Sequence, residues 1–419
     1  MIKVTSVIPD LPRRTWILLA GDAFSAIGNG MILPFTIIYL HRVRGFEIEI
    51  AALTLSFLSV VGLAAGPIAG ILIDRFGSRR VLLSALFLSM VGSFAFIPVR
   101  EPWQGFVAAG ISGAGLASFW PSIQALLSQS VEPHQRSAVF SVHYAALNLG
   151  IGIGGITGGF VADISAPITF QRLYVVDAVT FIPSMLLLAT VLKSLGPQPE
   201  IPAEEVEVSG SYLQVFRDRV FVRVWLLMVL LVTVGYSQLE SSFPAYATGA
   251  GGVGTEALGI AFAGNTFFIV ISQLIVLKRV EGKRRTDLIF ILCIVWALCW
   301  AVTLAAGALD AGWAQAGFLM AMVVFAFGET LLSPTIPAIV NDLAPDKLRG
   351  RYNAVYTLAW STGSIIGPAV AGVFLGARLA TLFFSCLIAL CVGAGLFGLS
   401  LRRRLLGSAN IVSEETSPA

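Results

Sequence analysis

The sequence predicts an all-α membrane protein whose 12 transmembrane helices form two pseudo-symmetric six-helix bundles. Three observations support this prediction: the scarcity of charge, the length of the apolar runs, and a repeat that relates the two halves. Of the 419 residues, 56% are hydrophobic and 12% are charged, about half the charged share of a soluble domain. This composition excludes an ordinary soluble enzyme and a disordered protein. A net charge of only +3 argues against a nucleic-acid binder, which needs clustered positive charge.

The apolar runs are long enough to cross the hydrocarbon core as helices, which takes about 20 residues. They cover 16–40, 49–73, 81–99, 105–129, 138–162, 172–194, 220–246, 256–277, 287–308, 313–340, 352–376 and 378–400. The strands of a membrane barrel would be shorter and would alternate in polarity. Helices are therefore predicted for all of these runs.

One long polar segment rich in Pro and Glu, 195–218, divides the spans six and six. We therefore expect an amino-terminal half over 1–194, a cytoplasmic linker over 195–218, a carboxy-terminal half over 219–404 and a cytoplasmic tail over 405–419. The linker is expected to end in a short amphipathic stretch at Tyr212–Arg223.

The basic residues are sorted by side of the membrane. With the amino terminus in the cytoplasm, 22 of the 27 Lys and Arg residues fall in inner segments and 5 in outer segments. Excess positive charge marks the cytoplasmic side. We therefore expect a multi-pass protein of the cell membrane (inner or plasma membrane) with both termini and the linker in the cytoplasm.

An internal repeat relates the two halves. Displaced by 213 residues, Gly115–Gly159 aligns with Gly328–Gly372 without a gap, and 11 of the 45 positions are identical. Random pairing at this composition would give fewer identities. Two homologous six-helix halves packed around a central cavity are an architecture of secondary transporters.

The loop between the second and third spans offers one carboxylate followed by basic side chains. It reads Gly70-Ile-Leu-Ile-Asp74-Arg75-Phe76-Gly77-Ser78-Arg79-Arg80. Gly77 suits a sharp turn because glycine tolerates strained backbone conformations. A loop that only sets topology needs positive charge and has no evident use for Asp74.

This loop resembles the signature motif of the major facilitator superfamily, G-x-x-x-D-R-x-G-R-R. The matching residues are Gly70, Asp74, Arg75, Gly77, Arg79 and Arg80. The resemblance covers the chain from about Trp16 to Arg404, and it implies that the six residues form a conformational gate that stabilises the outward-facing state. It also implies that Asp74 meets the start of the eleventh helix near Arg351–Asn353. Ser78 departs from the basic residue often found there.

The fifth span carries a glycine stripe formed by Gly150, Gly154, Gly158 and Gly159. Glycines at this spacing allow close helix approach, so packing alone is one interpretation. The stripe also resembles the antiporter motif G-x-x-x-G-P-x-x-G-G of the drug/proton antiporter branch, which implies export. The stripe departs from the motif at Gly155, where the family has Pro. A separate departure lies in the fourth span, where Ala109 stands four residues before Gly113-x-Gly115 at a position that is Arg in many such antiporters.

Carboxylates without basic partners lie inside four spans: Asp22, Asp177, Glu240 and Glu329. Charge in hydrocarbon is costly, so such residues usually mark an ion or substrate path. Desolvation favours the neutral form of a carboxyl group, which suits reversible proton binding. We predict proton coupling for Glu329, Glu240 and Asp22. Asp177, close to the outer end of its predicted span, is equally explained as a structural residue, and His143 is expected to make a local hydrogen bond.

The substrate cavity can be sketched from the resemblance, because helices 1, 4, 7 and 10 surround it in the superfamily. The candidate wall residues are Phe24, Asn29, Phe119, Trp120, Gln124, Tyr236, Gln238, Phe243 and Phe325. An aromatic cavity with carboxylates and no cationic group suits lipophilic neutral or cationic compounds, which gain cation–π contacts.

The sequence contains no catalytic constellation and no spacing typical of a metal site or a disulfide framework, so we expect no enzyme activity, cofactor or metal. The four cysteines lie in apolar runs without a CxxC pair. The function favoured is proton-coupled export of lipophilic small molecules by alternating access, by a monomer that contacts substrate, protons and membrane lipids but no nucleic acid. The alternatives are an importer or lysophospholipid flippase of the same fold, and a non-transporting receptor or scaffold.

Overall fold

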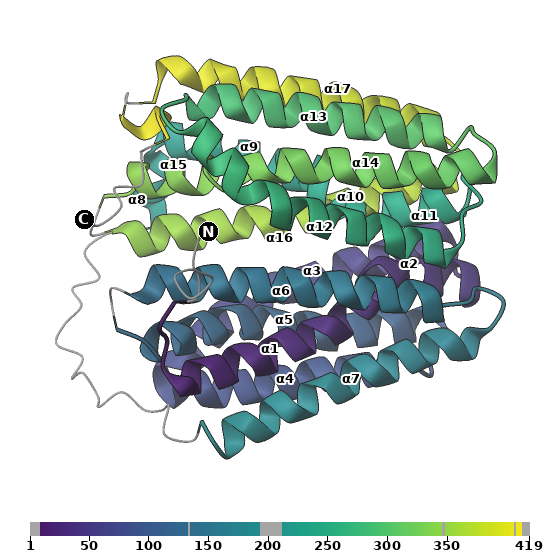
Figure 1. Cartoon of the computed structure of the whole chain (residues 1–419), viewed down its shortest axis with the longest axis horizontal. Coiled ribbons are helices and arrows are strands. Elements are labelled where there is room, and N and C mark those ends of the chain that lie inside the picture. The colour runs from purple at the N-terminus through teal and green to yellow at the C-terminus, as the bar shows by residue number, and fades with distance from the viewer. Residues whose placement is uncertain (1–8, 133–134, 193–211, 346–347, 406–407, 413–419) are drawn as a thin grey trace, which may run out of the picture. The chain divides into compact units, whose positions relative to one another are not determined.

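The computed structural model describes residues 9–132, 135–192, 212–345, 348–405 and 408–412. Within these ranges the chain is helical, and 12 helical segments are long and apolar enough to cross a membrane (Figure 1). An isolated β-bridge joins Arg284 to Ile411. The predicted fold class is confirmed.

The first six spans contain the helices up to Ala189. They are α1 (Arg13–Ile32) with the short α2 (Thr36–Ile38), α3 (Ile48–Phe76), α4 (Ser78–Phe96), α5 (Pro102–Gln129), α6 (Arg136–Val161) and α7 (Pro167–Ala189).

The last six spans follow a short helix, α8 (Tyr212–Arg217), which covers the first part of the predicted amphipathic stretch. They contain α9 (Arg219–Leu231), α10 (Ser237–Glu240), α11 (Ser242–Thr248), α12 (Thr255–Val280), α13 (Arg285–Ala306), α14 (Ala311–Leu332), α15 (Ile336–Leu343), α16 (Arg349–Gly376) and α17 (Ala380–Ser400). Asp218 separates α8 from α9 because its carboxylate accepts hydrogen bonds from Val220 N (2.9 Å) and Phe221 N (3.1 Å) and so caps α9. Most of the linker and the end of the tail lie outside the described residues.

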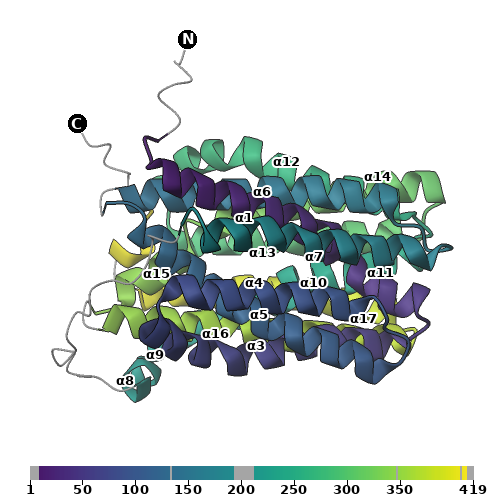
Figure 2. The ribbon, with the colours of Figure 1, turned by 90° about the horizontal axis from the view of Figure 1, so that it is seen from below.

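The described chain separates into two compact units. Unit 1 contains the residues up to Phe46 and from Phe57 to Leu192, and unit 2 contains Glu47–Ser56 and the residues from Tyr212 onward. In unit 1, α1 packs on α6 and α7, and α4 packs on α5 and α7 (Figures 1 and 2). In unit 2, the corresponding spans make the same pairs: α9 packs on α16 and α17, and α13 packs on α14 and α17. The repeat in the sequence is thus a repeat of helix pairings.

Spans 1, 7 and 10 are interrupted helices, whereas the sequence predicts continuous ones. Pro34 and Pro334 lie within the breaks of spans 1 and 10, and Pro244 lies in the first turn of α11, just after the break at Ser241 in span 7. Proline lacks the amide proton for the bond to the residue four positions earlier. Side-chain hydroxyl groups near the breaks donate hydrogen bonds to backbone carbonyl oxygens: Thr36 Oγ1 donates to Ile32 O (3.0 Å), and Thr335 Oγ1 donates to Leu332 O (2.8 Å). Interrupted helices of this kind form the binding sites of many transporters.

The turn between α6 and α7 is fixed by Asp163. Its Oδ1 accepts hydrogen bonds from the Ser165 hydroxyl (2.6 Å) and from Ser165 N (2.9 Å). Because these bonds stabilise the carboxylate, they hold the pKa of Asp163 below its usual value. The turn sets where α6 ends and α7 begins.

Candidate functional site

In unit 2, the carboxyl group of Glu329 is held by side chains from two other spans. Glu329 lies near the end of α14, is half-buried, and is hydrogen-bonded by Tyr236 and Asn265. The Asn265 amide, on α12, also donates to Met322 O at 3.3 Å, which fixes its orientation. Spans 7, 8 and 10 thus meet at this carboxyl group.

Aromatic rings surround Tyr236. Its ring centroid is 4.8 Å from that of Trp360, 5.5 Å from Trp296 and 5.8 Å from Phe325. Trp296 and Phe325 stack at 4.6 Å with an angle of 6° between the rings, and both are fully buried. Tyr236 and Trp360 remain half-buried. The predicted wall residues Tyr236 and Phe325 therefore belong to one aromatic group beside Glu329.

Two glycines make room for this aromatic group. A Cβ atom at Gly328 would lie 2.5 Å from Nε1 of Trp296, and a Cβ at Gly235 would collide with the same ring. Gly235 belongs to a π-helical turn, Val232–Tyr236, at the end of α9. The Gly-Glu sequence of span 10 thus places a close ring contact next to the carboxyl group.

The other predicted residues of span 7 have different surroundings. Glu240 is exposed at the end of α10, and the hydrogen bonds of the described residues include none to its carboxylate. Gln238 is 1% exposed; its amide donates to Thr233 O (2.7 Å) and accepts from the Ser242 hydroxyl (2.6 Å). Phe243 is buried between other rings. Gln238 and Phe243 thus lie in the interior of unit 2.

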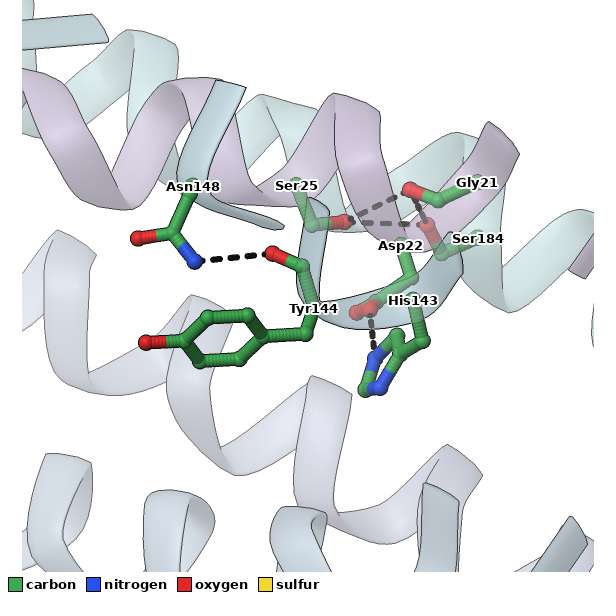
Figure 3. A network of polar contacts seen from close by, with 7 residues as sticks. All are labelled: Gly21, Asp22, Ser25, His143, Tyr144, Asn148 and Ser184. Atoms are coloured by element: carbon green, nitrogen blue, oxygen red, sulfur yellow. Dashed lines mark hydrogen bonds and ion pairs between the residues drawn. The ribbon is translucent and has the colours of Figure 1, made fainter. Parts of the chain in front are cut away.

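In unit 1, Asp22 of α1 is paired with His143 of α6 (Figure 3). The Nε2 atom of His143 lies 2.6 Å from Oδ2 of Asp22, and the two residues are 5% and 6% exposed. Beside the pair, the Ser25 and Ser184 hydroxyls are 2.9 Å apart, and Ser184 donates to Gly21 O at 2.7 Å. This polar group joins spans 1, 5 and 6.

The predicted wall residues of unit 1 lie around the pair. Trp120 is 42% exposed and its ring meets His143 edge-on at 6.3 Å. Phe24 (46%) and Gln124 are also exposed, while Asn29 is half-buried. Phe119 packs against the hydrophobic core of the unit. The structure therefore leaves Phe24, Trp120 and Gln124 accessible from outside the unit.

The motif loop between α3 and α4 is a tight turn at Gly77, whose φ is +84°. Arg79 donates to Leu188 O of α7 at 2.7 Å, and the Arg75 guanidinium lies 5.3 Å from the Phe76 ring centroid. Among the six residues that match the motif, Asp74, Arg75 and Arg80 have exposed side chains, and a Cβ on Gly70 would meet no atom within 4 Å. The gate assigned to this loop stays a prediction.

The glycine stripe of α6 contacts α1. A Cβ on Gly150 would lie 2.7 Å from Ala23 O, and one on Gly158 would lie 2.6 Å from Met31 O. At Gly154 the added atom would collide with Ile27 O. Gly159 is buried. The stripe thus brings two backbones together, and its link to export stays a prediction.

Asp177 lies in the middle part of α7 and is 1% exposed. Its Oδ2 accepts a hydrogen bond from Ser93 of α4, and the residue lies against Gly28 of α1. The span begins at Pro167, earlier than predicted, because a proline at the first turn starts the helix. Asp177 therefore links three helices inside unit 1.

Within the described residues no group of three or more His, Cys, Asp and Glu side chains could hold a metal ion. Sequence reasoning proposed Glu329 and Asp22 as site residues and expected a local hydrogen bond at His143, but it named neither Asn265 nor the pairing of His143 with Asp22. A polar side chain inside an apolar span was the available signal for both. Which carboxylate each one contacts depends on helix packing, which one sequence does not reveal.

The comparisons with known proteins all point to membrane transporters. A profile of the Major Facilitator Superfamily matches residues 18–319 and 252–416. The chain is 27% identical to the uncharacterized transporter YqjV of Bacillus subtilis (strain 168), over 87% of each chain. It is 24% identical to a Na+, Li+, K+/H+ antiporter of Planococcus maritimus, over 86% of this chain and 89% of that one.

A further relative is the quinolone resistance protein NorA of Staphylococcus aureus (strain MSSA476), which is 22% identical over 84% of this chain and 87% of its own. Among solved structures, a peptide transporter, POT, crystallised with sulfate has a TM-score of 0.77 at 16% identity, covering 96% of both chains; at that identity the likeness concerns the fold alone. Because the family profile matches nearly the whole chain, the protein is a transporter of the major facilitator superfamily and not an enzyme.

Proposed function

We propose that the protein exports lipophilic small molecules across the cell membrane in exchange for protons, by alternating access. The observation that carries this proposal is the Glu329 carboxyl group, held by Tyr236 and Asn265 beside a group of aromatic rings. A carboxyl group binds and releases protons, and aromatic rings bind lipophilic molecules and organic cations. The two requirements of a drug/proton exchange thus lie side by side in unit 2.

In the proposed cycle, a proton from outside neutralises Glu329, with Glu240 and Asp22 as further candidates. Binding of a lipophilic molecule then competes with that proton. The gradient drives export because at the outer face an entering proton replaces the substrate, and at the inner face the substrate replaces the proton. We further propose that the carrier acts as a monomer with both termini in the cytoplasm.

Two of the relatives bear on the choice of substrate, and they favour different ones. NorA, by its name a quinolone resistance protein, favours export of organic molecules. The Na+, Li+, K+/H+ antiporter favours a second candidate, exchange of monovalent metal cations for protons, for which the oxygen atoms of Glu329, Asn265 and Tyr236 are suitable ligands. The aromatic rings around Tyr236 are the reason for placing organic substrates first. Import of organic substrates and lysophospholipid flipping remain further alternatives.

The test is transport by purified protein in proteoliposomes under an imposed pH gradient, with ethidium as the lipophilic probe and Na+ and K+ in parallel. We expect Glu329→Gln to lower gradient-driven ethidium transport at least about tenfold while ethidium binding persists, because the amide cannot carry a proton. The matched control is Glu256→Gln, an exposed carboxylate in the first turn of α12.

Proton coupling by these residues is contradicted if gradient-driven transport is unchanged in Glu329→Gln, in Glu240→Gln and in Asp22→Asn. Movement of Na+ or K+ but not ethidium selects the second candidate. Accumulation of ethidium instead of its exclusion selects import.

A further inference from the structure

The pair formed by Asp22 and His143 is a closed polar contact between two spans of unit 1. The carboxylate and the imidazole are 2.6 Å apart and nearly inaccessible to solvent. At this distance the two groups form a hydrogen bond, donated by the imidazole N–H or by the carboxyl O–H.

The surroundings of the pair are apolar. The residues from α4, α5 and α7 that line the space beside Asp22 are Leu82, Leu86, Phe119, Ile123, Ser184, Leu187 and Leu188. Of the charged groups on these elements, Arg80 and Arg172 are exposed, Arg79 donates to Leu188 O, and Asp177 accepts from Ser93. On α1, Arg13 and Arg14 belong to the first turn, more than two turns before Asp22. Within the described lining, no third titratable side chain faces the pair.

The backbones that carry the pair are held at a fixed spacing. Gly150, two turns after His143 on α6, packs against Ala23, the neighbour of Asp22, and a Cβ there would lie 2.7 Å from Ala23 O. Gly154 and Gly30 continue the contact. The close approach of α1 and α6 along this line thus brings the backbones that carry Asp22 and His143 together.

Helix packing does not by itself require this pair. The repeat places Tyr356 of unit 2 at the position of His143, and the matching helix contact there involves no carboxylate: the Tyr356 hydroxyl donates to the sulfur of Met228 on α9 at 3.8 Å. The glycine contacts are nevertheless repeated, since Gly363 packs against Val232 as Gly150 packs against Ala23. Of these two equivalent positions, unit 1 alone carries the carboxylate–imidazole contact.

We propose that Asp22 and His143 form one proton-binding unit, which carries a single exchangeable proton during the transport cycle. With that proton the pair is neutral overall, and without it the pair carries one negative charge in an apolar site. The proton comes from water on one side of the membrane and returns to water on the other. This inference rests on the proposed proton-driven exchange, and it makes His143 a partner in coupling and not only a local hydrogen-bonding residue.

The first test follows the pair itself and needs no substrate. The chain has three histidines, so ring-labelled histidine gives a simple NMR spectrum of the protein in micelles, and His41→Gln and His134→Gln assign the remaining signal. We expect the midpoint of the His143 titration to differ by at least about one pH unit between the wild type and Asp22→Asn, with His41 unchanged. Identical His143 titrations in the two proteins would overturn the proposal.

The second test measures the pH dependence of gradient-driven ethidium transport in His143→Gln. The glutamine still hydrogen-bonds to Asp22, but only a carboxyl group, with a reference pKa near 4 against about 6.5 for imidazole, is left to bind the proton. We therefore expect the midpoint to move toward acid pH by at least about one unit. Tyr356→Phe is the matched control at the repeat-equivalent position and should keep the wild-type profile.

A wild-type profile in folded His143→Gln also overturns the proposal, and size-exclusion chromatography verifies folding. If the wild-type protein shows no gradient-driven transport, the proposed function fails, and the histidine titration then decides the pair independently.

Discussion

Gly154 is the tightest point of the contact between α1 and α6. An added Cβ would collide with the Ile27 carbonyl and lie 2.9 Å from Gly30 Cα, so the backbones would have to move apart. We expect Gly154→Ala to destabilise the protein by about 1–3 kcal/mol, the usual cost of overpacking. The measurement is the unfolding midpoint of purified protein in mixed detergent micelles.

The matched control for this substitution is Gly66→Ala in α3, where an added Cβ meets no atom within 4 Å. Alanine is favoured over glycine in a helix by roughly 0.5–1 kcal/mol, so this variant should be neutral or slightly more stable. Equal losses in both variants would show that the close contact at Gly154 is not the cause.

At the residue scale, the sequence identifies polar groups inside the spans but not the side chains that contact them. Glu329 and Asp22 stand out because a carboxylate in an apolar run is costly. Gln238 and Phe243 were chosen as wall residues by helix number alone, yet their side chains face the interior of unit 2. The direction in which a side chain points depends on helix rotation, and the π-helical turn at Val232–Tyr236 changes that rotation in span 7.

At the scale of helices, the spans were predictable because about 20 apolar residues have few other uses. The interruptions within spans 1, 7 and 10 were not predictable in the same way. Pro67, Pro121, Pro183 and Pro368 all lie inside continuous helices, whereas Pro34, Pro244 and Pro334 mark interruptions. What separates the two sets is tertiary: side chains such as Thr36 and Thr335 supply hydrogen bonds at the breaks. Proline in the sequence therefore shows where a break is allowed without showing that it occurs.

The segment 408–412 is tied to the loop between α12 and α13. Val412 N donates to Lys283 O and Gly282 N donates to Val412 O, both at 3.0 Å. The Asn410 amide oxygen accepts from Thr286 N at 3.1 Å in a buried position. Arg285, which pairs with Asp342 of α15, also donates to Ala409 O. These hydrogen bonds hold segment 408–412 against the start of α13.

We expect Asn410→Ala to lower stability by about 1–3 kcal/mol, because it leaves the buried Thr286 amide without its acceptor. Thermal unfolding of the full chain measures this. Ser400→Ala serves as the control, since that exposed hydroxyl bonds to Phe397 O within its own helix. A loss confined to Ser400→Ala would contradict the fastening role of Asn410.

At the scale of the whole molecule, the repeat is stronger in structure than in sequence. Only 11 of 45 positions agree between the aligned segments, yet the helix pairs recur in both units. The two halves have the same residue at positions such as Gly150 and Gly363, where helix backbones approach closely. They have different residues where the side chains make different contacts, as at His143 and Tyr356.

The orientation in the membrane can be tested with a single cysteine in a protein that lacks the native four. The excess of basic residues predicts that Arg402 lies on the cytoplasmic side and that Ser165, in the turn between α6 and α7, lies outside. In intact cells we expect a membrane-impermeant maleimide to label Ser165→Cys and to leave Arg402→Cys unlabelled until the cells are opened. The reverse pattern would contradict cytoplasmic termini.

The pairing of Asp22 with His143 also has a consequence for biogenesis, since the two residues are separated by 121 positions along the chain. At a synthesis rate of about 5–20 residues per second, Asp22 is made roughly 6 to 24 s before its partner. Throughout that interval the nascent first span carries Asp22 without its partner His143 and without the glycine stripe of α6 to pack against. A chain that stalls before its fifth span would therefore expose the Asp22 carboxyl group to lipid. This exposed acid distinguishes an incomplete chain from a complete one and could be recognised by membrane quality control.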